Sequence, residues 1–412
     1  MPRYDRQPTG FDMNCGVKPA LLALMVSALM LPAAQAQEDD LPLFLTASQT
    51  FTRDSNLFRD DANKQSDTIS STALRLGVNK AYGRQNYRLD VTASRNSYSE
   101  FDQFNYNGLV SSGEFVTDIG SHFRLTASGA ASETLPRFED SEANRTGRNT
   151  LRVKRGALDL RYGLYGRMSV NMGYNQADQK YRITTSDNRD SDTWNAGVRY
   201  QPTDLMFYGL NYSQTDTKFV DRVNKEQVQR RNLSLVANWR VTGFSLLSGS
   251  LGYTRERYEK DPAADFNGVT GSAAWTFTPA GKVSYRLNWL RDTNNQGGFT
   301  AAGGLATVSQ QRLTNQFAAS ASWQATSKIA ANLQLTHVRY DEERSQESSL
   351  PPLNADASQK GRLNSISLGV DYQPLRSLSV GCDVQRYDRT ESVFSRAYSG
   401  RSMSCSVGFT LD

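Results

Sequence analysis

The sequence predicts an all-β protein: a transmembrane antiparallel β-barrel whose strands run up and down in chain order. The first observation is a pattern that returns at intervals of about forty residues, as internal repeats do. An alternating apolar segment ends in an aromatic residue such as Trp239 or Tyr372, a short polar turn follows, and alternation resumes. The second observation is the apolar-polar alternation itself. The third is that tight turns alternate with long polar loops, which is typical of outer-membrane barrels.

The composition fits a barrel better than a bundle of membrane helices. The chain has 412 residues, 38% of them hydrophobic, and its mean hydropathy is -0.59. A barrel tolerates this polarity because only every second strand residue meets lipid. The net charge is +5 and no long run of Lys or Arg occurs. We therefore expect no nucleic-acid partner.

The first segment is typical of a secretory signal peptide. Lys18 precedes an apolar run from Ala20 to Leu31, and small residues follow up to Ala36. We expect a signal peptide over 1–36, with Met13 as an alternative start, and the barrel over 37–412. A single membrane anchor is the alternative reading, but the run is shorter than the ~20 residues that a membrane helix needs.

The order of turns and loops predicts about eighteen strands. Because short turns are periplasmic in this class, we expect both termini on the periplasmic side. Residues 67–80 and 204–216 alternate less clearly, so sixteen strands is the alternative. Tight turns are predicted near residues 82, 120, 164, 202, 242, 280, 326 and 375. Long loops are predicted near 55–66, 96–106, 134–149, 181–191, 217–229, 258–266, 292–308, 343–360 and 391–399.

The tryptophans predict two belts of aromatic side chains. Trp239, Trp275 and Trp323 come just before tight turns, whereas Trp194 and Trp289 lie next to long loops. Aromatic belts of this kind mark the two membrane interfaces of a barrel. The alternative is that these are core tryptophans of a soluble β-protein.

Successive residues of a strand point to opposite faces, and this parity predicts which charged residues line the lumen. A charged side chain facing lipid at mid-bilayer costs roughly 2–4 kcal/mol, so we expect charged residues within strands to face inward. Basic side chains in a pore favour anions. The alternative is that the arginines pair with the aspartates and only brace the wall. The candidate lumen residues are Arg88, Asp90, Arg124, Arg199, Arg240, Arg286, Asp371 and Asp383.

Two cysteines remain after the signal peptide. Cys382 and Cys405 fall on the last two predicted strands, with the same parity and similar distances from the turn end. A disulfide between them is one outcome, because secreted compartments are oxidising, and two free thiols are the other.

No catalytic motif occurs in the chain. The two histidines, His122 and His337, are far apart, and there is no H-E-x-x-H, G-x-S-x-G or P-loop motif. The acidic run Asp341-Glu342-Glu343 is interpreted as a solvated loop rather than a calcium site. We therefore expect no enzyme activity, no cofactor and no metal.

Some segments resemble a known family. They are Ser55-Asn56-Leu57-Phe58-Arg59, Ser66-Asp67-Thr68-Ile69, Phe266-Asn267-Gly268-Val269-Thr270-Gly271 and Trp275-Thr276-Phe277-Thr278-Pro279-Ala280-Gly281-Lys282. The chain resembles the EpsL family, the exosortase/PEP-CTERM-associated outer-membrane proteins of exopolysaccharide biosynthesis, and the broader group of porin-like β-barrels. Ser55 stands where that family usually has an aspartate, and the chain ends on Asp412 rather than on the phenylalanine common in such barrels.

The resemblance implies a passive conduit or accessory for the export or assembly of an exopolysaccharide in the outer membrane. The implied partners are outer-membrane lipid, the exopolysaccharide, and inner-membrane or periplasmic export components. A general or solute-selective porin is the first alternative. The second is a structural or adhesive surface barrel with a blocked lumen.

Overall fold

The computed structural model describes most of the chain after the first segment. The predicted signal peptide lies outside the described residues. Of residues 263, 299–300, 306–312, 342–348 and 357–359, only the backbone is described. The described ranges are 43–138, 147–222, 225–260, 262–279, 281–293, 299–300, 306–348, 357–390 and 396–411.

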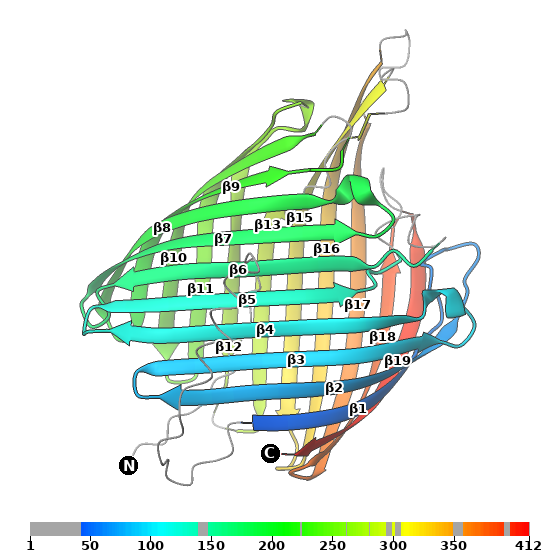
Figure 1. The fold of residues 1–412 in the computed structure, drawn as a ribbon, viewed down its shortest axis with the longest axis horizontal. Helices are drawn as coiled ribbons and strands as arrows, with labels where there is room; N and C mark the ends of the chain where they lie inside the picture. The colour runs from blue at the N-terminus through cyan, green and yellow to red at the C-terminus, as the bar shows by residue number, and fades with distance from the viewer. Residues whose placement is uncertain are drawn as a thin grey trace, which may run out of the picture.

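These residues form one sheet of nineteen strands (Figure 1). In chain order the strands are β1 (Leu43–Asp54), β2 (Asp67–Tyr82), β3 (Gln85–Tyr98), β4 (Tyr106–Ile119), β5 (Phe123–Thr134), β6 (Leu151–Tyr162), β7 (Met168–Tyr181), β8 (Arg189–Thr203), β9 (Met206–Lys218), β10 (Gln227–Thr242), β11 (Ser245–Tyr258), β12 (Phe266–Phe277), β13 (Val283–Thr293), β14 (Phe299–Thr300), β15 (Ala306–Gln324), β16 (Ile329–Ser348), β17 (Ala357–Leu375), β18 (Leu378–Arg389) and β19 (Tyr398–Leu411). Three short 3-10 helices lie in loops: η1 (Asp102–Phe104), η2 (Thr185–Asp187) and η3 (Pro262–Ala264). No described helix is long and apolar enough to cross a membrane.

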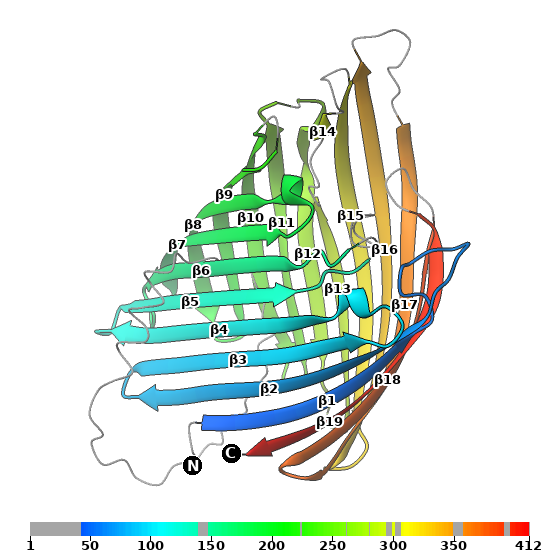
Figure 2. The same cartoon turned by 45° about the vertical axis from the view of Figure 1, so that its right-hand side comes forward.

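The sheet closes on itself. Each long strand pairs antiparallel with the next, and β1 pairs with β19 in a register that runs from Leu45↔Leu411 to Asp54↔Ser402 (Figures 1 and 2). Strand β14 has two residues, and β13 pairs directly with β15. Eighteen long strands of the described chain therefore make up the wall. The all-β barrel prediction is confirmed, and the sixteen-strand alternative is wrong because residues 67–80 and 204–216 form β2 and β9.

Tight turns and long loops gather at opposite ends of the barrel, which are called here the turn end and the loop end. Every predicted tight turn falls between two strands, as between Tyr82 and Gln85 or between Leu375 and Leu378. The predicted loop 343–360 was too wide, since β16 continues to Ser348 and β17 begins at Ala357. The polar residues of this stretch are typical of a loop. Backbone groups in paired strands satisfy one another's hydrogen bonds whatever the side chains are, so polar residues can continue a strand.

The register also shows which side of each strand faces the interior. The Arg230 guanidinium of β10 bonds to Asp292 and Thr293 of β13, across the two intervening strands β11 and β12. Only the concave side of the wall allows such a contact. The opposite side of β10 carries the exposed Leu233 and Leu235, so the apolar side chains point outward.

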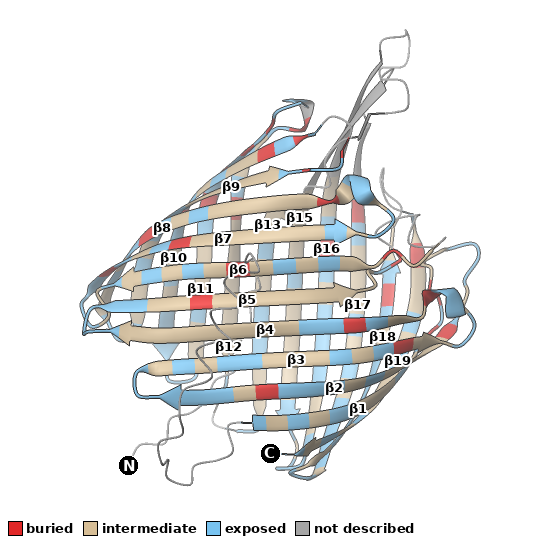
Figure 3. Ribbon diagram, viewed as in Figure 1, coloured by how far each residue is buried: buried red, intermediate tan, exposed pale blue. Residues whose placement is uncertain are grey.

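This outward apolar face continues around the wall. Leu45, Leu76 and Val91 follow one another in register on β1, β2 and β3. Figure 3 shows that most wall residues are exposed or half-buried and that few are buried. A closed barrel leaves no unpaired strand edge, so all its ladder groups can be satisfied in lipid. The protein is therefore an outer-membrane β-barrel.

The two cysteines meet on the last two strands. Cys382 of β18 is the register partner of Cys405 of β19, and a disulfide joins them with Cα atoms 4.1 Å apart. Both share the outward parity of Val380 and Val407.

We expect the unreduced protein to yield one cross-linked peptide containing Cys382 and Cys405. The two cysteines are 23 residues apart in the sequence, and opening a loop of that length predicts that Cys405→Ser lowers the free energy of unfolding by roughly 3–4 kcal/mol. The neighbouring strands stay paired without the bond. Peptide mass spectrometry after thiol blocking checks the bond. Free, alkylated Cys382 in the unreduced wild type would contradict it.

Candidate functional site

The eight charged residues predicted for the lumen share one side of their strands. Arg88 and Asp90 alternate with the outward Leu89 and Val91 of β3, and Arg240 has the parity of Arg230, whose contacts cross the interior. The same register reasoning places Arg124, Arg199, Arg286, Asp371 and Asp383 on the interior side.

The interior arginines form a row near the turn end. Arg124 of β5 and Arg161 of β6 are direct register partners. Arg161 Nη2 donates to Ser169 Oγ at 3.2 Å, and Ser169 of β7 is the register partner of Arg199 on β8. Guanidinium groups from β5, β6 and β8 therefore lie close together along the wall. Sequence reasoning missed Arg161, although the outward Leu158, Leu160 and Tyr162 give its parity.

Two of the predicted arginines are neutralised by carboxylates. Arg124 holds Asp118 in a two-bond ion pair, with Nε and Oδ1 2.7 Å apart. Arg88 Nη1 lies 3.3 Å from Glu114 Oε1. Both carboxylates come from β4 and were not among the predicted site residues. Asp90 pairs instead with Arg75 on β2, at 2.6 Å. The bracing role thus applies to these arginines, but with carboxylates other than those expected.

Three other predicted arginines have no carboxylate within 4 Å among the described residues: Arg199, Arg240 and Arg286. The Arg199 guanidinium carbon lies 3.6 Å from the centre of the Phe207 ring, and its Nη2 donates to Gln201. Arg286 Nε donates to Thr276 Oγ1 at 3.3 Å. These three interior arginines near the turn end therefore lack a direct ion pair.

Acidic residues lie on another part of the wall. Asp371 of β17 accepts a hydrogen bond from Asn332 Nδ2 at 2.9 Å. Together with Asp383 of β18 it lines a small cavity of about 280 Å³. Figures 1 and 2 show β3–β8 on one wall and β16–β18 on the facing wall. The guanidinium row and these two aspartates therefore face each other across the barrel.

Towards the loop end, the interior carries a larger cavity of about 620 Å³. Its lining is rich in hydroxyl and amide groups, and some of them bond to each other. Thr193 and Thr215 lie 2.9 Å apart through their Oγ1 atoms, as do the hydroxyls of Ser191 and Thr217. Such groups both donate and accept hydrogen bonds, so this wall offers contacts to polar, uncharged parts of a solute.

At the edge of this cavity, Arg230 lies between two carboxylates. Its Nη1 is 3.2 Å from Glu256 Oε1, and its Nη2 pairs with Asp292. The Glu256 side chain is fully buried, whereas the Asp292 side chain is partly exposed, so two carboxylates and one guanidinium leave net negative charge at this edge of the cavity.

The Asn56-Leu57-Phe58-Arg59 segment is used for packing. Leu57 is buried with Phe104 and Phe138 at the loop end. Arg59 Nη1 lies 2.9 Å from Asp54 Oδ2. This segment, one of those that carry the EpsL resemblance, thus contributes Leu57 to the small core of a loop cluster.

The five predicted belt tryptophans all have outward parity. Trp239 and Trp275 both face Leu247 from the two sides of β11, near the turn end. Trp323 lies next to the turn that follows β15. Trp194 packs against Tyr174 with ring centroids 4.4 Å apart. It and Trp289 lie nearer the loop end of their strands.

The histidines do not meet. His122 lies in the turn after β4 and bonds to Ser121, whereas His337 lies on the outer face of β16 and bonds to Asn364. Within the described ranges, no group of three or more His, Cys, Asp or Glu side chains could hold a metal ion.

The chain matches no protein-family model. No curated protein matches its sequence either. It is similar to solved structures of outer-membrane proteins. OccK2 (OpdF) of Pseudomonas aeruginosa has 13% identity and a TM-score of 0.48, covering 90% of this chain and 97% of that one. OccK5 (OpdH) of the same organism has 12% identity and a TM-score of 0.46, covering 90% and 98%. OccAB3 of Acinetobacter baumannii has 9% identity and a TM-score of 0.46, again covering 90% and 98%.

Proposed function

We propose that the protein is a passive, solute-selective porin that favours small anionic solutes, with the turn end and both termini facing the periplasm. The observation that carries the proposal is the interior placement of Arg199, Arg240 and Arg286 without carboxylate partners. A pore lined by basic side chains attracts anions and repels cations. The barrel carries the solute down its gradient and performs no chemistry on it.

The aspartates on the facing wall would create an electric field across the lumen, in addition to its net charge. Asp371 and Asp383 lie opposite the arginine row, so a field crosses the pore at the turn end. A low-dielectric wall focuses such a field into the water-filled space. A solute with a carboxylate at one end and hydroxyl groups at the other would align its charge with the arginines. Its hydroxyls would then contact the polar cavity towards the loop end.

Reconstitution into a planar bilayer tests this function. We expect stepwise conductance, and under a salt gradient a reversal potential of the sign that anion permeation gives. A cation preference, or the absence of any conductance from protein that shows the folded, heat-modifiable band on a gel, would contradict the proposal. Protein boiled before reconstitution is the control for contaminating channels.

A role in exopolysaccharide export rests on the EpsL resemblance alone. The Asn56-Leu57-Phe58-Arg59 segment, one of those that carry it, packs in a loop cluster. A strain without the gene separates the two functions. Slower uptake of small anions with unchanged polymer yield favours the porin, whereas reduced surface polymer with unchanged uptake favours export.

A further inference from the structure

The outer face of the barrel carries arginines just beyond its apolar band, at the loop end. Arg231 of β10 and Arg255 of β11 lie two residues nearer the loop end than the outward Leu233 and Tyr253. Arg386 of β18 and Arg401 of β19 lie two residues nearer the loop end than Val384 and Met403. Several of them lie directly opposite one another across neighbouring strands. The cross-strand pairs are Arg231↔Arg255, Arg339↔Arg362 and Arg386↔Arg401.

Like charges placed opposite each other on a sheet are destabilising, so the pairs need compensation. Arg339 has Asp341 at 3.6 Å. Arg386 and Arg401 have no carboxylate within 4 Å among the described residues, and neither do Arg231, Arg255 and Arg362. Arg53 of β1, next to Arg401 on the diagonal, adds a further outward cation. A negatively charged group from outside the chain would remove the repulsion.

A groove on the same outer face is lined on one side by Arg386 of β18. It has a volume of about 590 Å³. Two register rows line the groove. In one row the apolar Leu335 and Ile366 lead to Arg386 on β18. The next row towards the loop end runs from Phe317 through His337 and Asn364 to Asp388.

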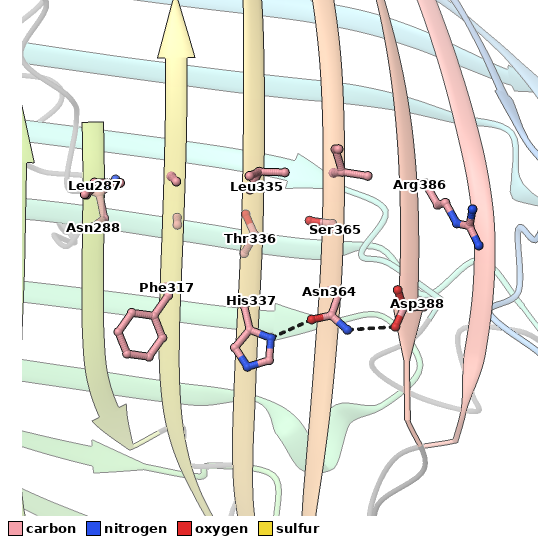
Figure 4. A pocket seen from close by; sticks show the side chains of 13 residues that line it. Leu287, Asn288, Phe317, Leu335, Thr336, His337, Asn364, Ser365, Arg386 and Asp388 are labelled. Carbon is pink, nitrogen blue, oxygen red and sulfur yellow. Dashed lines mark hydrogen bonds between the residues drawn. The ribbon is translucent and has the colours of Figure 1, made fainter. Parts of the chain in front are cut away.

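Figure 4 shows the polar part as a chain of contacts across three strands. His337 Nδ1 lies 2.7 Å from Asn364 Oδ1, and Asn364 Nδ2 donates to Asp388 Oδ2 at 3.0 Å. Asp388 keeps its negative charge while it accepts this hydrogen bond, and it forms no ion pair within 4 Å of Arg386, which lies beside Ile366 in register. The apolar row of Leu335 and Ile366 thus ends at the cation Arg386 on β18.

We propose that this groove binds a membrane lipid that carries phosphate, with an acyl chain on Leu335 and Ile366 and the phosphate between Arg386 and Arg401. Guanidinium groups bind phosphate through two parallel hydrogen bonds, and cationic pockets at a membrane surface bind anionic headgroups. A second copy of the chain fits less well, because a two-fold contact would bring the same arginines together. Given the proposed orientation, the lipid lies in the outer leaflet.

Binding of lipid A by the refolded, lipid-free protein tests the proposal, with native mass spectrometry in detergent as the readout. We expect wild type to bind diphosphoryl lipid A and the double variant Arg386→Gln/Arg401→Gln to bind it about tenfold more weakly, as expected for two lost charge-assisted contacts. The control Lys80→Gln/Lys282→Gln removes the same charge at the turn end and should bind like wild type.

Three outcomes would overturn the proposal. They are unchanged binding by the arginine double variant, equal binding of dephosphorylated lipid A, and displacement of lipid A by inorganic phosphate alone, since the last would leave the groove without a role. If the double variant does not fold, Ile366→Trp replaces it. This change fills the groove with a side chain that lipid tolerates, so folding should persist while lipid binding falls. Conductance is measured separately, so a failed porin proposal and a failed lipid site remain distinguishable.

Discussion

Replacing Leu235 with arginine is expected to lower the free energy of unfolding from a bilayer by about 2–4 kcal/mol, the cost of a lipid-facing arginine near mid-bilayer. Leu235 lies near the middle of β10 and is 65% exposed on the outer face. Its register partners Leu210 and Leu251 are also outward leucines, so the new guanidinium has no polar neighbour. Reversible unfolding in denaturant with lipid vesicles measures the change.

The matched control is Val236→Arg, one residue further along the same strand. Val236 has the interior parity of Arg230, and its register partners are Ser250 and Gly209. An arginine there reaches the polar interior, so we expect a much smaller loss of stability. Equal losses at the two positions would mean that the outer face is not in lipid.

Reversing two interior charges is expected to reverse the ion preference of the pore. Arg199→Glu/Arg286→Glu replaces two interior cations near the turn end, on β8 and β13, with anions, while Asp371 and Asp383 are unchanged. The two new carboxylates repel anions where the two guanidinium groups attracted them. The reversal potential in a salt gradient should change sign, and single-channel conductance should persist.

The control for this variant is Arg231→Glu/Arg255→Glu, which makes the same charge change on the outer face of β10 and β11. The wall separates these residues from the pore, so their effect on ion preference should be small. The charge assignment would be contradicted by an unchanged reversal potential in the interior variant. It would equally be contradicted by a sign change in the outer variant.

The sequence determined the class of fold, the turns and the two faces of each strand. Alternation with a period of two is a local property, and tight turns carry their own residue signals. Thus the interior parity of Arg88, Arg240 and Asp371 could be read from their apolar neighbours. The ambiguous stretches 67–80 and 204–216 became strands because paired neighbours on both sides hold them, which no local pattern reports.

Only the tertiary structure decided which charged groups meet. Arg124 pairs with Asp118 and Arg230 with Asp292, whereas parity alone allowed many other partners. The arginine pairs on the outer face, such as Arg386↔Arg401, depend in the same way on strand register. Register follows from turn geometry and from the stagger of strands around the closed wall. The face on which a residue lies depends on the alternation within its own strand. A contact depends on the register between two strands, and that register is fixed only when the barrel has closed.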